Sequence, residues 1–558
     1  MSNFFGVYNA SGLHDEHNYL INELIRYWLG LDATQKNRFM DEYIALMAAD
    51  YGQYHQSAWH ESCRFISTLV GHPLLTENRT EDLETLVRAD KQTSSPFKKA
   101  EGAYCFVKYD SLDNSLELTT DVLGLRPFYY AQVDGAVIFS TTLKFFEALS
   151  IPLTQDPEGT AEFSTLGYYL LDHTPFKEVK CVRPGFMTRL QSEGSMQLNR
   201  YFNWLDLIEE PVSNDAAIDN INRDFRLACE KYLGRDDRVL TTLSGGIGSR
   251  LITCELIRQN REVVAYNFSQ AETQDIFCAR EFSKTVPIEL QEIRVNDTQS
   301  QSVESRLGLH WQKAQPPQYK TVSRPQLAWS GNGGSVGLGF IYCSEALYHA
   351  ALSQNKAELA SAYIEQQFAF LPASIVVEWE QQQALLKSNI IKSLEEFEGI
   401  PLEKAYYLFL LHNDQHHHLT VPYEEVDDYQ MEFCLPIYSW KVLRHTLNVP
   451  AAELRRHKFY LAWLEKYYPE ALKTPWQAYP GHIPCPHKIK QRDQWQLVHR
   501  KRIPILQVLQ SWLTVLSKGK RANLNRSRYS LLCLLHCLHL KDISTHARYA
   551  IEATRWLA

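Results

Sequence analysis

The sequence predicts a mixed α/β protein with more than one domain, and three observations support this prediction. A chain of 558 residues is too long to fold around a single hydrophobic core. Short segments of alternating polar and apolar residues, separated by turn residues, run through positions 1–203 and are typical of strands. Strands and helices then alternate over positions 214–295, the pattern of a doubly wound parallel sheet, and the chain is mostly helical from about position 345.

The N-terminal region combines strand patterns with one helical pattern. An apolar spacing of three and four residues predicts an inserted helical region over 17–52; the residues with this spacing are Leu20, Leu24, Tyr27 and Trp28. The segment 205–214 contains Pro211 and is the expected linker after a first domain at 1–204. The expected strands of this domain are 4–8, 103–108, 115–120, 128–132 and 136–140.

The second region begins with an amphipathic helix at 214–233. A strand, a loop and a helix follow over 238–259. A strand at 262–268, a helix at 274–285 and a strand at 289–295 come next. Parallel doubly wound sheets bind their ligands at the carboxyl ends of the strands, so the loop that follows the first of these strands is the expected ligand site.

That loop has the composition of a phosphate-binding turn. Positions 243–250 read L-S-G-G-I-G-S-R, between a short apolar run and a helical segment. A glycine-rich turn of this kind directs backbone N–H groups toward the helix N-terminus, where the helix dipole favours an anion. Ser244 and Ser249 add hydroxyl donors. The alternative is a strand–helix turn that needs glycines only for its backbone geometry.

Three segments of the N-terminal region resemble class II glutamine amidotransferase domains. Positions 119–130 read T-T-D-V-L-G-L-R-P-F-Y-Y, which is similar to the D-x-x-G-x-(R/K)-P-L-Y-Y segment of that family. Positions 101–110, E-G-A-Y-C-F-V-K-Y-D, resemble its G-x-F-A-F-x-x-Y-D strand, and R-Y-F at 200–202 resembles its closing R-Y-W. The resemblance implies an N-terminal αββα sandwich of the Ntn type at 1–204.

The following region resembles the ATP-pyrophosphatase domain of the asparagine synthetase family. The loop at 243–250 is similar to the S-G-G-x-D-S loop of that family, and V-V-A-Y-N-F-S at 263–269 is similar to its second strand. W-S-G-N-G-G-S-V-G-L-G at 329–339 and M-E-F-C-L-P-I-Y-S at 431–439 resemble its later S-G-(D/E)-G-(G/S)-D-E and E-x-R-x-P-F-L-D segments. The resemblance implies a doubly wound ATP-pyrophosphatase domain at 214–486.

The same resemblance implies ATP as the cofactor and assigns it to both glycine-rich loops. Serines and glycines of the first loop would hold the pyrophosphate, residues of the second loop would approach the nucleotide, and Ser269 would lie near the adenine. The expected nucleotide-binding residues are Leu243, Ser244, Gly245, Gly246, Ile247, Gly248, Ser249, Arg250, Ser269, Ser330 and Gly331.

The amidotransferase half departs from its family at the nucleophile. Ser2 takes the position of the N-terminal cysteine, and Asn3 replaces the small glycine behind it. A hydroxyl can be activated by an adjacent amine, but it is a far weaker nucleophile than a thiolate. The family's N-G-E segment is also missing, because positions 62–73 read S-C-R-F-I-S-T-L-V-G-H-P. The sequence therefore predicts that Ser2 is a relic and that glutamine is not hydrolysed.

The synthetase half departs from its family at the metal. Gly248 and Ser335 stand where the family has two magnesium-binding aspartates, and a divalent cation needs hard anionic oxygens. The sequence therefore offers few ligands for a bound Mg²⁺ ion. Arg250 adds a positive charge beside the loop and is a tentative countercharge for phosphate. Near the C-terminal end, Lys473 is out of register with the family's lysine, and Trp476 occupies the expected position.

A helical, basic extension is predicted at 487–558. Between 487 and 528 the sequence contains a single acid, Asp493; the basic residues there are Lys488, Lys490, Arg492, Arg500, Lys501, Arg502, Lys518, Lys520, Arg521, Arg526 and Arg528. Such a segment suits an anionic partner, and the alternative is a solvated pair of helices. Two histidine-rich stretches are interpreted as packed or solvated helix and turn rather than as metal sites; they are Cys533, His536, Cys537 and His539, and the run at 416–418.

The composition is that of an ordinary globular protein, with 45% hydrophobic and 22% charged residues. No apolar run approaches about 18 residues and no charged-then-apolar leader is present, so a cytoplasmic protein without a membrane span is expected. Eleven cysteines without a C-x-x-C pair fit a reducing compartment.

Two functions from different classes fit these residues. The first is an ATP-dependent carbon–nitrogen ligase that adenylates a carboxylate and lets ammonia or an amine attack it, without hydrolysing glutamine. Its substrate would be a small-molecule or peptide carboxylate, and the protein is a possible homodimer with no specific nucleic-acid partner. The second is a catalytically impaired homologue that binds a nucleotide, a metabolite or a protein. The surviving loop serines and glycines favour the first.

Overall fold

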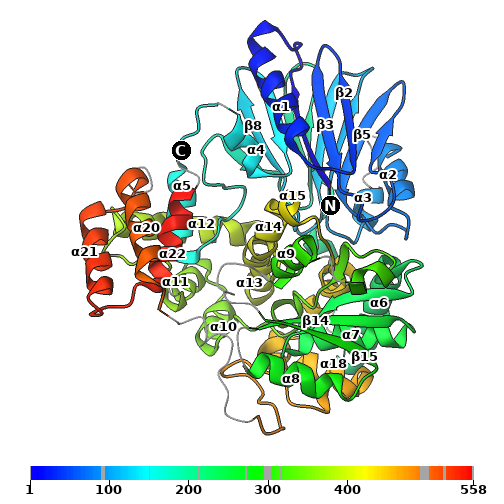
Figure 1. The fold of residues 1–558 in the computed structure, drawn as a ribbon, viewed down its shortest axis with the longest axis vertical. Helices are drawn as coiled ribbons and strands as arrows, with labels where there is room; N and C mark the ends of the chain where they lie inside the picture. Colours follow the sequence, from blue (N-terminus) through cyan, green and yellow to red (C-terminus); the bar gives the residue numbers. More distant parts are fainter. Residues whose placement is uncertain are drawn as a thin grey trace. The chain divides into compact units, whose positions relative to one another are not determined.

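The computed structural model describes residues 2–89, 95–149, 151–209, 213–269, 273–294, 303–314, 317–367, 369–489, 502–519 and 523–555 (Figure 1). The chain divides into two compact units, each assembled from separate stretches of sequence. The first unit comprises Met1–Leu149, Val182–Cys343 and Leu410–Trp495, and the second comprises Ser150–Cys181, Ser344–Phe409 and Gln496–Ala558. The sequence predicted three consecutive domains instead.

Two antiparallel sheets lie face to face in the N-terminal part of the first unit. Within this unit one sheet runs β8-β9-β1-β3-β2 and the other runs β12-β11-β7-β6-β5-β4. Apolar side chains of both sheets form one core between them, among them Phe4, Ile44, Val107 and Leu118. The strands are β1 (Ser2–Tyr8), β2 (Gln35–Met40), β3 (Ile44–Asp50), β4 (Trp59–Glu61), β5 (Phe65–Gly71), β6 (Tyr104–Asp110), β7 (Ser115–Thr120), β8 (Tyr129–Val133), β9 (Ala136–Ser140), β11 (Phe186–Leu190) and β12 (Met196–Arg200).

Helices cover the outer faces of these sheets. Helix α1 (Asn18–Gly30) packs on β1 and β3, and α4 (Leu143–Ala148) packs on β9. On the other sheet, α2 (Arg79–Val87) packs on β5, and α3 (Ser95–Lys99) packs on α2. Helix α2 begins where the side chain of Asn78 accepts hydrogen bonds from the first helical N–H groups. The layers are therefore helix, sheet, sheet and helix, as the αββα prediction has them.

The predicted helical region over 17–52 is only partly helical. The structure ends α1 at Gly30 and continues with β2 and β3. Every residue of β3 is buried, so this strand reads as a continuous apolar run instead of an alternating one. A short apolar run does not by itself distinguish a buried strand from a buried helix, and this ambiguity explains the wrong prediction.

A parallel sheet forms the other part of the first unit. It runs in the order β15-β14-β13-β16-β17, and every pair is parallel. The strand order reverses between β13 and β16, so this is the position where open parallel sheets bind ligands. The predicted alternation over 214–295 is observed as α6 (Asn214–Leu233), β13 (Arg238–Thr242), α7 (Ile247–Arg258), β14 (Glu262–Ser269), α8 (Gln274–Ser283) and β15 (Ile288–Arg294).

Short strands and helices complete this part. The two remaining strands are β16 (Leu327–Trp329) and β17 (Glu432–Cys434). The remaining helices and helical turns are α9 (Val303–Ala314), η3 (Pro317–Thr321), η4 (Gly334–Leu338), η5 (Leu410–Gln415), α14 (His416–Glu424), α15 (Val426–Tyr429), η6 (Pro436–Tyr438), α16 (Trp440–Leu447), α17 (Ala451–Leu454), η7 (Arg455–His457), α18 (Lys458–Tyr467) and η8 (Pro469–Leu472). The histidine run at 416–418 opens α14, where His416 Nδ1 donates a hydrogen bond to the Gly124 carbonyl.

Buried polar contacts join the sandwich to the parallel-sheet part within the first unit. Arg126 forms a buried ion pair with Glu432 at the start of β17. The carboxylate of Glu101 pairs with Lys231 Nζ at 2.5 Å and with Lys441 Nζ at 2.8 Å. Burying charges is favourable only when they are paired, so these contacts link the two parts firmly.

The second unit is mainly helical. Its elements are α5 (Pro157–Leu166), β10 (Val179–Cys181), α10 (Glu345–Leu352), α11 (Lys356–Gln366), α12 (Trp379–Glu395), α13 (Leu402–Phe409), α20 (Ile505–Lys518), α21 (Arg526–Cys537) and α22 (Ser544–Arg555). The last three helices do not form a separate extension, because their apolar faces share a core with Leu371, Ile375 and Val376. That core also encloses Cys533 and surrounds His536, whose Nε2 donates a hydrogen bond to the Ile503 carbonyl at 3.3 Å.

Within the described ranges, no helix has both the length and the hydrophobicity that crossing a bilayer requires.

Candidate functional site

The first glycine-rich loop joins β13 to α7 at the carboxyl end of the central strand. Its backbone is held by its own hydroxyls: the N–H of Ser244 donates to Ser249 Oγ at 3.0 Å, and the N–H of Gly246 donates to Ser244 Oγ at 3.2 Å. The N–H of Gly245 donates to Asp275 Oδ1 at 2.7 Å. These are the groups from which the sequence predicted a phosphate cradle, and here they already have acceptors within the chain.

Asp275 is the acidic residue of this loop environment. Its second oxygen accepts a hydrogen bond from Asn267 Nδ2 at 2.7 Å, and the side chain lies at the start of α8. Burial raises the pKa of Asp275, although the hydrogen bonds from Gly245 and Asn267 oppose this shift. The Asp275 carboxylate thus offers the Gly245 amide the same kind of acceptor oxygen that a bound anion would offer.

The second glycine-rich loop lies directly against the first. A Cβ atom on Gly331 would come within 2.3 Å of the Ser249 backbone nitrogen, and a Cβ on Gly248 would come within 2.7 Å of the Gly331 carbonyl oxygen. Only glycine permits such a close backbone approach. The structure thus brings together the two loops that the sequence predicted to form one site, at the point where the strand order reverses.

The residues between these loops do not fit a magnesium ion. Gly248 and Ser335 offer no carboxylate, and the hydroxyl of Tyr460 lies 3.8 Å from the Cβ position of Gly248 and 3.1 Å from that of Gly334. This hydroxyl is buried without a hydrogen-bond partner. The Tyr460 side chain therefore fills the space beside Gly248. Hard cations need several anionic or carbonyl oxygens, and this set does not supply them.

Arg250 does not point at the loop. Its guanidinium is fully buried and donates to the carbonyls of Ala471 at 3.0 Å, Thr474 at 3.2 Å and Cys278 at 3.0 Å, and to the carbonyl of Pro475. Burial lowers its pKa to about 10, which leaves it charged at neutral pH. The predicted role as a phosphate countercharge does not match this geometry. Several backbone carbonyls converge here, and a guanidinium has enough N–H groups to donate to all of them. Arg250 thereby holds the segment 471–475 against α7.

The segment held by Arg250 continues to the first loop. The N–H of Gln477 donates to the Gly245 carbonyl at 2.9 Å, and its side-chain oxygen lies 3.1 Å from the Cβ position of Gly245. Trp476, at the place of the family's lysine, is buried. The sequence resemblance predicts a lysine in this stretch and gives no signal for Gln477, the residue that contacts the loop.

The remaining predicted nucleotide residues lie near the same loops but have other partners. Ser330 Oγ donates to Glu304 Oε1 at 2.6 Å and accepts a hydrogen bond from the N–H of Asn332 at 3.2 Å. Ile247 and Leu243 are buried, and Ser269 ends β14. Glu304 was not predicted, because no motif signals the α9 residue that faces a loop about 25 positions later in the sequence.

In the sandwich, Ser2 lies at the start of the central strand β1, where the sequence predicted a relic nucleophile. Its hydroxyl donates to Asp50 Oδ2 at 2.9 Å and accepts a hydrogen bond from Arg79 Nη2 at 2.8 Å. Arg79 is buried, and its Nη1 pairs with Asp50 Oδ2 at 3.0 Å. Burial alone would raise the pKa of Asp50, but the Arg79 charge together with the hydrogen bonds from Gly52 and Ser2 lowers the pKa. Neither Asp50 nor Arg79 was predicted, since no spacing links them to Ser2.

The place of the missing N-G-E segment is the turn after β5. Gly71 ends that strand with a φ of +81°, and a Cβ there would lie 2.1 Å from the Ala103 carbonyl oxygen. Val70 and His72 flank it, and His72 Nε2 lies 3.2 Å from Asp82 Oδ2. The turn keeps its glycine but carries neither the asparagine nor the glutamate of the family pattern.

Comparisons with known proteins agree with the resemblance to glutamine amidotransferase domains and to asparagine synthetases. Residues 71–202 match the glutamine amidotransferase domain family. Asparagine synthetase [glutamine-hydrolyzing] 3 of Bacillus subtilis is 29% identical over 178 residues, which cover 31% of this chain and 29% of that protein. Asparagine synthetase [glutamine-hydrolyzing] 1 of the same bacterium is 21% identical over 221 residues, 39% of this chain and 34% of that protein. Over these stretches the chain is similar to asparagine synthetases and to the glutamine amidotransferase domain family.

The human asparagine synthetase [glutamine-hydrolyzing] is 24% identical over 204 residues, which cover 35% of this chain and 36% of that protein. The chain thus matches roughly a third of the length of its asparagine synthetase relatives. Two solved structures match this chain only with low TM-scores. A glutamine phosphoribosylpyrophosphate amidotransferase from B. subtilis scores 0.25, with 13% identity over 52% of this chain and 65% of that one. An allosteric regulatory enzyme of purine biosynthesis scores 0.26, with 12% identity over 59% and 74%.

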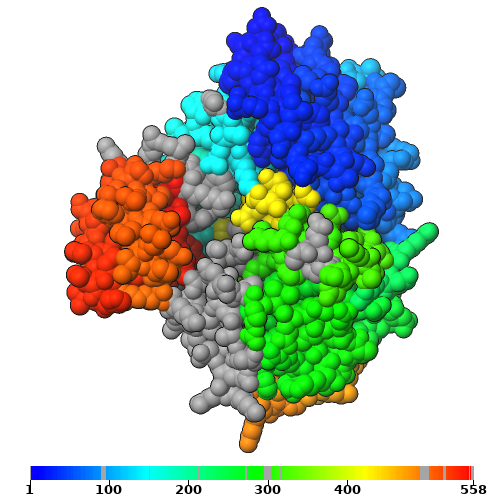
Figure 2. Space-filling model, viewed as in Figure 1, coloured from blue at the N-terminus to red at the C-terminus, as the bar shows by residue number. Residues whose placement is uncertain are grey.

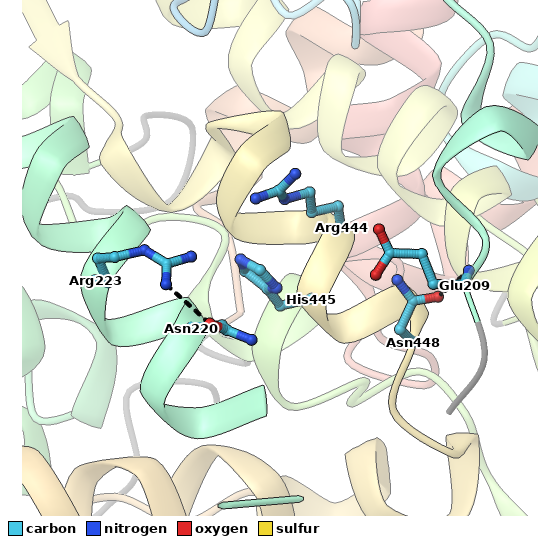
Figure 3. A pocket seen from close by; sticks show the side chains of 6 residues that line it. All are labelled: Glu209, Asn220, Arg223, Arg444, His445 and Asn448. Carbon is cyan, nitrogen blue, oxygen red and sulfur yellow. Dashed lines mark hydrogen bonds between the residues drawn. The ribbon is translucent and has the colours of Figure 1, made fainter. Parts of the chain in front are cut away.

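A small polar pocket of about 130 Å³ lies elsewhere in the first unit, between α6 and α16; it is lined by Glu209, Asn220, Arg223, Arg444, His445 and Asn448 (Figure 3). Asp224 accepts hydrogen bonds from the three basic side chains, at 3.1 Å from Arg223, 3.1 Å from Arg444 and 2.8 Å from His445. Burial opposes its ionisation, but these bonds lower its pKa to about 2. The single Asp224 carboxylate therefore neutralises part of the charge of these basic side chains.

Proposed function

We propose that this chain is a catalytically impaired member of the asparagine synthetase family that acts by binding. In this proposal it neither hydrolyses glutamine nor adenylates a carboxylate. The observation that carries the proposal is the closed arrangement of the two glycine-rich loops. Gly248 and Gly331 lie in backbone contact, and the hydroxyl of Tyr460 fills the space beside them. Metal-assisted transfer at a phosphate needs a cation held between anionic oxygens, and these residues provide none.

The amidotransferase half supports the same proposal. The hydroxyl of Ser2 already donates to Asp50 and accepts from Arg79, so both its proton and its exposed lone pair are engaged. A carboxylate whose pKa is lowered by a buried arginine is a poor general base. Neither of the two side chains that hydrogen-bond to Ser2 is therefore a base suited to activate this weak nucleophile.

A second candidate is an ATP-dependent amide-forming ligase that uses ammonia or an amine. The features that favour it are the serines and glycines of the first loop and the parallel sheet with its strand-order reversal. ATP would have to compete with Asp275 for the Gly245 amide, and no aspartate stands at 248 or 335 to hold a metal.

One experiment separates the two candidates. The purified protein is mixed with ATP, Mg²⁺, ammonia or glutamine, and a panel of carboxylic acids that includes aspartate, and pyrophosphate and glutamate are measured. A competent asparagine synthetase is assayed beside it. If the chain is catalytically impaired, we expect both products to stay at the level of the blank. We also expect calorimetry to show no Mg²⁺-dependent binding of ATP. Magnesium-dependent pyrophosphate release would establish the ligase instead.

A further inference from the structure

The small pocket between α6 and α16 carries side chains of both charges on its lining. Helix α6 leads into the parallel sheet, and the surface of this stretch of the chain is green in Figure 2. None of the lining residues belongs to the glycine-rich loops or to the cluster of Ser2, Asp50 and Arg79. Binding of a ligand in this pocket therefore does not depend on whether those loops bind ATP.

Basic side chains form one end of the pocket, and a buried carboxylate holds them in place. Asp224 on α6 is 6% exposed, and its Oδ1 accepts a hydrogen bond from Arg223 Nε. Its Oδ2 accepts hydrogen bonds from Arg444 Nη2 and His445 Nε2, both on α16. The two guanidiniums carry two positive charges and Asp224 carries one negative charge, so one fixed positive charge remains at this end.

The guanidinium of Arg444 has N–H groups left for a ligand. Its Nε is buried without a hydrogen-bond partner, and among the described residues only its Nη2 donates to another side chain. A buried donor without an acceptor is unfavourable, so an acceptor that enters the pocket gains a hydrogen bond here. A carboxylate suits this position, because its two oxygens match the planar fork of a guanidinium.

The other end of the pocket carries the carboxylate of Glu209. The backbone N–H of Glu209 donates to Asn448 Oδ1 at 3.0 Å, and Asn448 Nδ2 donates to the Leu207 carbonyl at 3.1 Å. These two bonds fix the backbone of Glu209 beside the pocket. Its exposed side chain forms no hydrogen bond or ion pair with another described residue. Figure 3 shows Arg223 and His445 toward one end of the pocket and Glu209 toward the other.

A ligand that matches both ends carries a negative and a positive group on a small frame. An anion alone would meet the like charge of Glu209, and a cation alone would meet the guanidiniums. The volume of about 130 Å³ limits the size of the ligand, since a cavity of about 150 Å³ accommodates benzene. We propose that this pocket binds a small zwitterion, a free amino acid with a short side chain. Its carboxylate lies at Arg444 and its ammonium group at Glu209.

The test measures binding to the full-length protein by titration calorimetry, without ATP or Mg²⁺. Glycine and L-alanine are the probes, and acetate and methylammonium at the same ionic strength are the controls that carry only one of the two charges. We expect glycine and alanine to bind with millimolar dissociation constants. Acetate and methylammonium should bind at least tenfold more weakly, a difference of about 1.4 kcal/mol.

Two variants, each with a matched control, assign the binding to this pocket. Glu209→Gln removes the negative charge and keeps the size of the side chain; its control is Glu230→Gln, at an exposed glutamate of α6 that does not line the pocket. Arg223→Gln removes one positive charge, and its control is Arg226→Gln on the same helix. The side chains of Arg223 and Arg226 are 56% and 48% exposed, and Arg226 pairs with Glu255 outside the pocket. All variants are first compared by circular dichroism and melting temperature.

We expect Glu209→Gln to weaken glycine binding at least tenfold and to strengthen acetate binding, because one carboxylate attracts an ammonium group and repels an anion. Arg223→Gln should weaken the binding of both ligands, and the two control variants should stay within twofold of the natural protein. A merely structural role of Glu209 would not move glycine and acetate in opposite directions. The proposal is overturned if neither amino acid binds, if acetate binds as tightly as glycine, or if Glu209→Gln leaves the affinity for glycine unchanged.

Discussion

The guanidinium of Arg79 donates a hydrogen bond to the hydroxyl of Ser2 across 2.8 Å. Ser2 begins the central strand of its sheet, whereas Arg79 comes from the first turn of α2. The same guanidinium pairs with Asp50, which in turn accepts the Ser2 proton at 2.9 Å. The position where the family places a nucleophile is therefore a closed, fully bonded cluster, and its groups serve the fold.

The first prediction concerns Ser2 as a nucleophile. We expect no glutamate release from glutamine in the natural protein, in Ser2→Ala or in Ser2→Cys. A thiol at position 2 would still lack the family's N-G-E segment, which supplies the oxyanion hole. The measurement is a coupled glutamate assay, with a competent amidotransferase as positive control. A signal that Ser2→Ala abolishes, or that Ser2→Cys creates, would contradict the prediction.

The second prediction concerns the Arg79–Asp50 ion pair. Arg79→Leu leaves Asp50 buried without a countercharge, and we expect a loss of about 3–5 kcal/mol in the free energy of unfolding. Adding Asp50→Asn should recover much of that loss, because the double variant contains no uncompensated charge. Denaturant unfolding of the natural protein, both single variants and the double variant measures the coupling. Additive losses in the double variant would show that the pair does not act as a unit.

Acid should act on the same pair with a defined sign. The pKa of Asp50 is lowered in the folded protein, so its contribution to stability is complete above the unfolded value of about 3.9 and is lost as the pH falls through the folded value. The natural protein should therefore lose stability relative to Asp50→Asn only below about pH 4.

The order of elements between 214 and 295 could be predicted from the sequence because the apolar residues of each element repeat with one clear spacing. Helix α6 buries residues at helical spacing, begins at the capping side chain of Ser213 and ends at Gly234 with a φ of +53°. Strand β3 could not be read in this way. It is buried on both faces, and burial removes the polar residues that make a strand visible as an alternation.

Only those parts of the candidate site that lie within one short stretch of sequence could be predicted. The two glycine-rich loops were found because each is a short motif in one stretch of sequence. Tyr460 and Gln477, which contact these loops, come from segments more than 200 residues after the first loop. Arg250 was assigned to phosphate because it follows the loop directly, yet its direction is set by carbonyls from 471–475 that only the fold brings near.

The third prediction uses Glu424, which accepts hydrogen bonds from Thr142 Oγ1 at 2.7 Å and from the N–H of Leu143 at 3.0 Å. Burial raises the pKa of Glu424 to about 7, although these hydrogen bonds oppose the shift. A carboxyl with a raised folded pKa stabilises the fold below its unfolded value of about 4.3 and loses that effect as the pH rises through 7. Relative to Glu424→Gln, the natural protein should thus lose a few kcal/mol between about pH 4 and pH 7. A stability difference that does not change over this range would contradict the prediction.

The fourth prediction tests the closed loops by restoring the family's aspartate. In Gly248→Asp the new Cβ would meet the Gly331 carbonyl oxygen at 2.7 Å, and we expect a loss of about 1–3 kcal/mol from this overpacking. Gly246→Ala is the control, because a Cβ there would meet Ser244 Oγ at an ordinary 3.5 Å. Gly248→Asp combined with Ser335→Asp should show no rise in melting temperature on adding Mg²⁺. A Mg²⁺-dependent rise in this double variant alone would mean that the loops can open and hold the metal.

The last prediction concerns the role of Arg250. Its guanidinium donates to carbonyls of Ala471, Thr474 and Cys278, so Arg250→Ala leaves several buried acceptors without donors. We expect a loss of about 3 kcal/mol or more in the free energy of unfolding, and a fall of several degrees in melting temperature. Arg258→Ala on the same helix is the matched control. Arg258 lies 3.3 Å from Glu470 in a partly exposed ion pair, which is worth about 1 kcal/mol or less. If Arg250→Ala instead leaves the melting temperature unchanged and weakens pyrophosphate binding tenfold, the guanidinium serves the phosphate site and the positioning role assigned here is wrong.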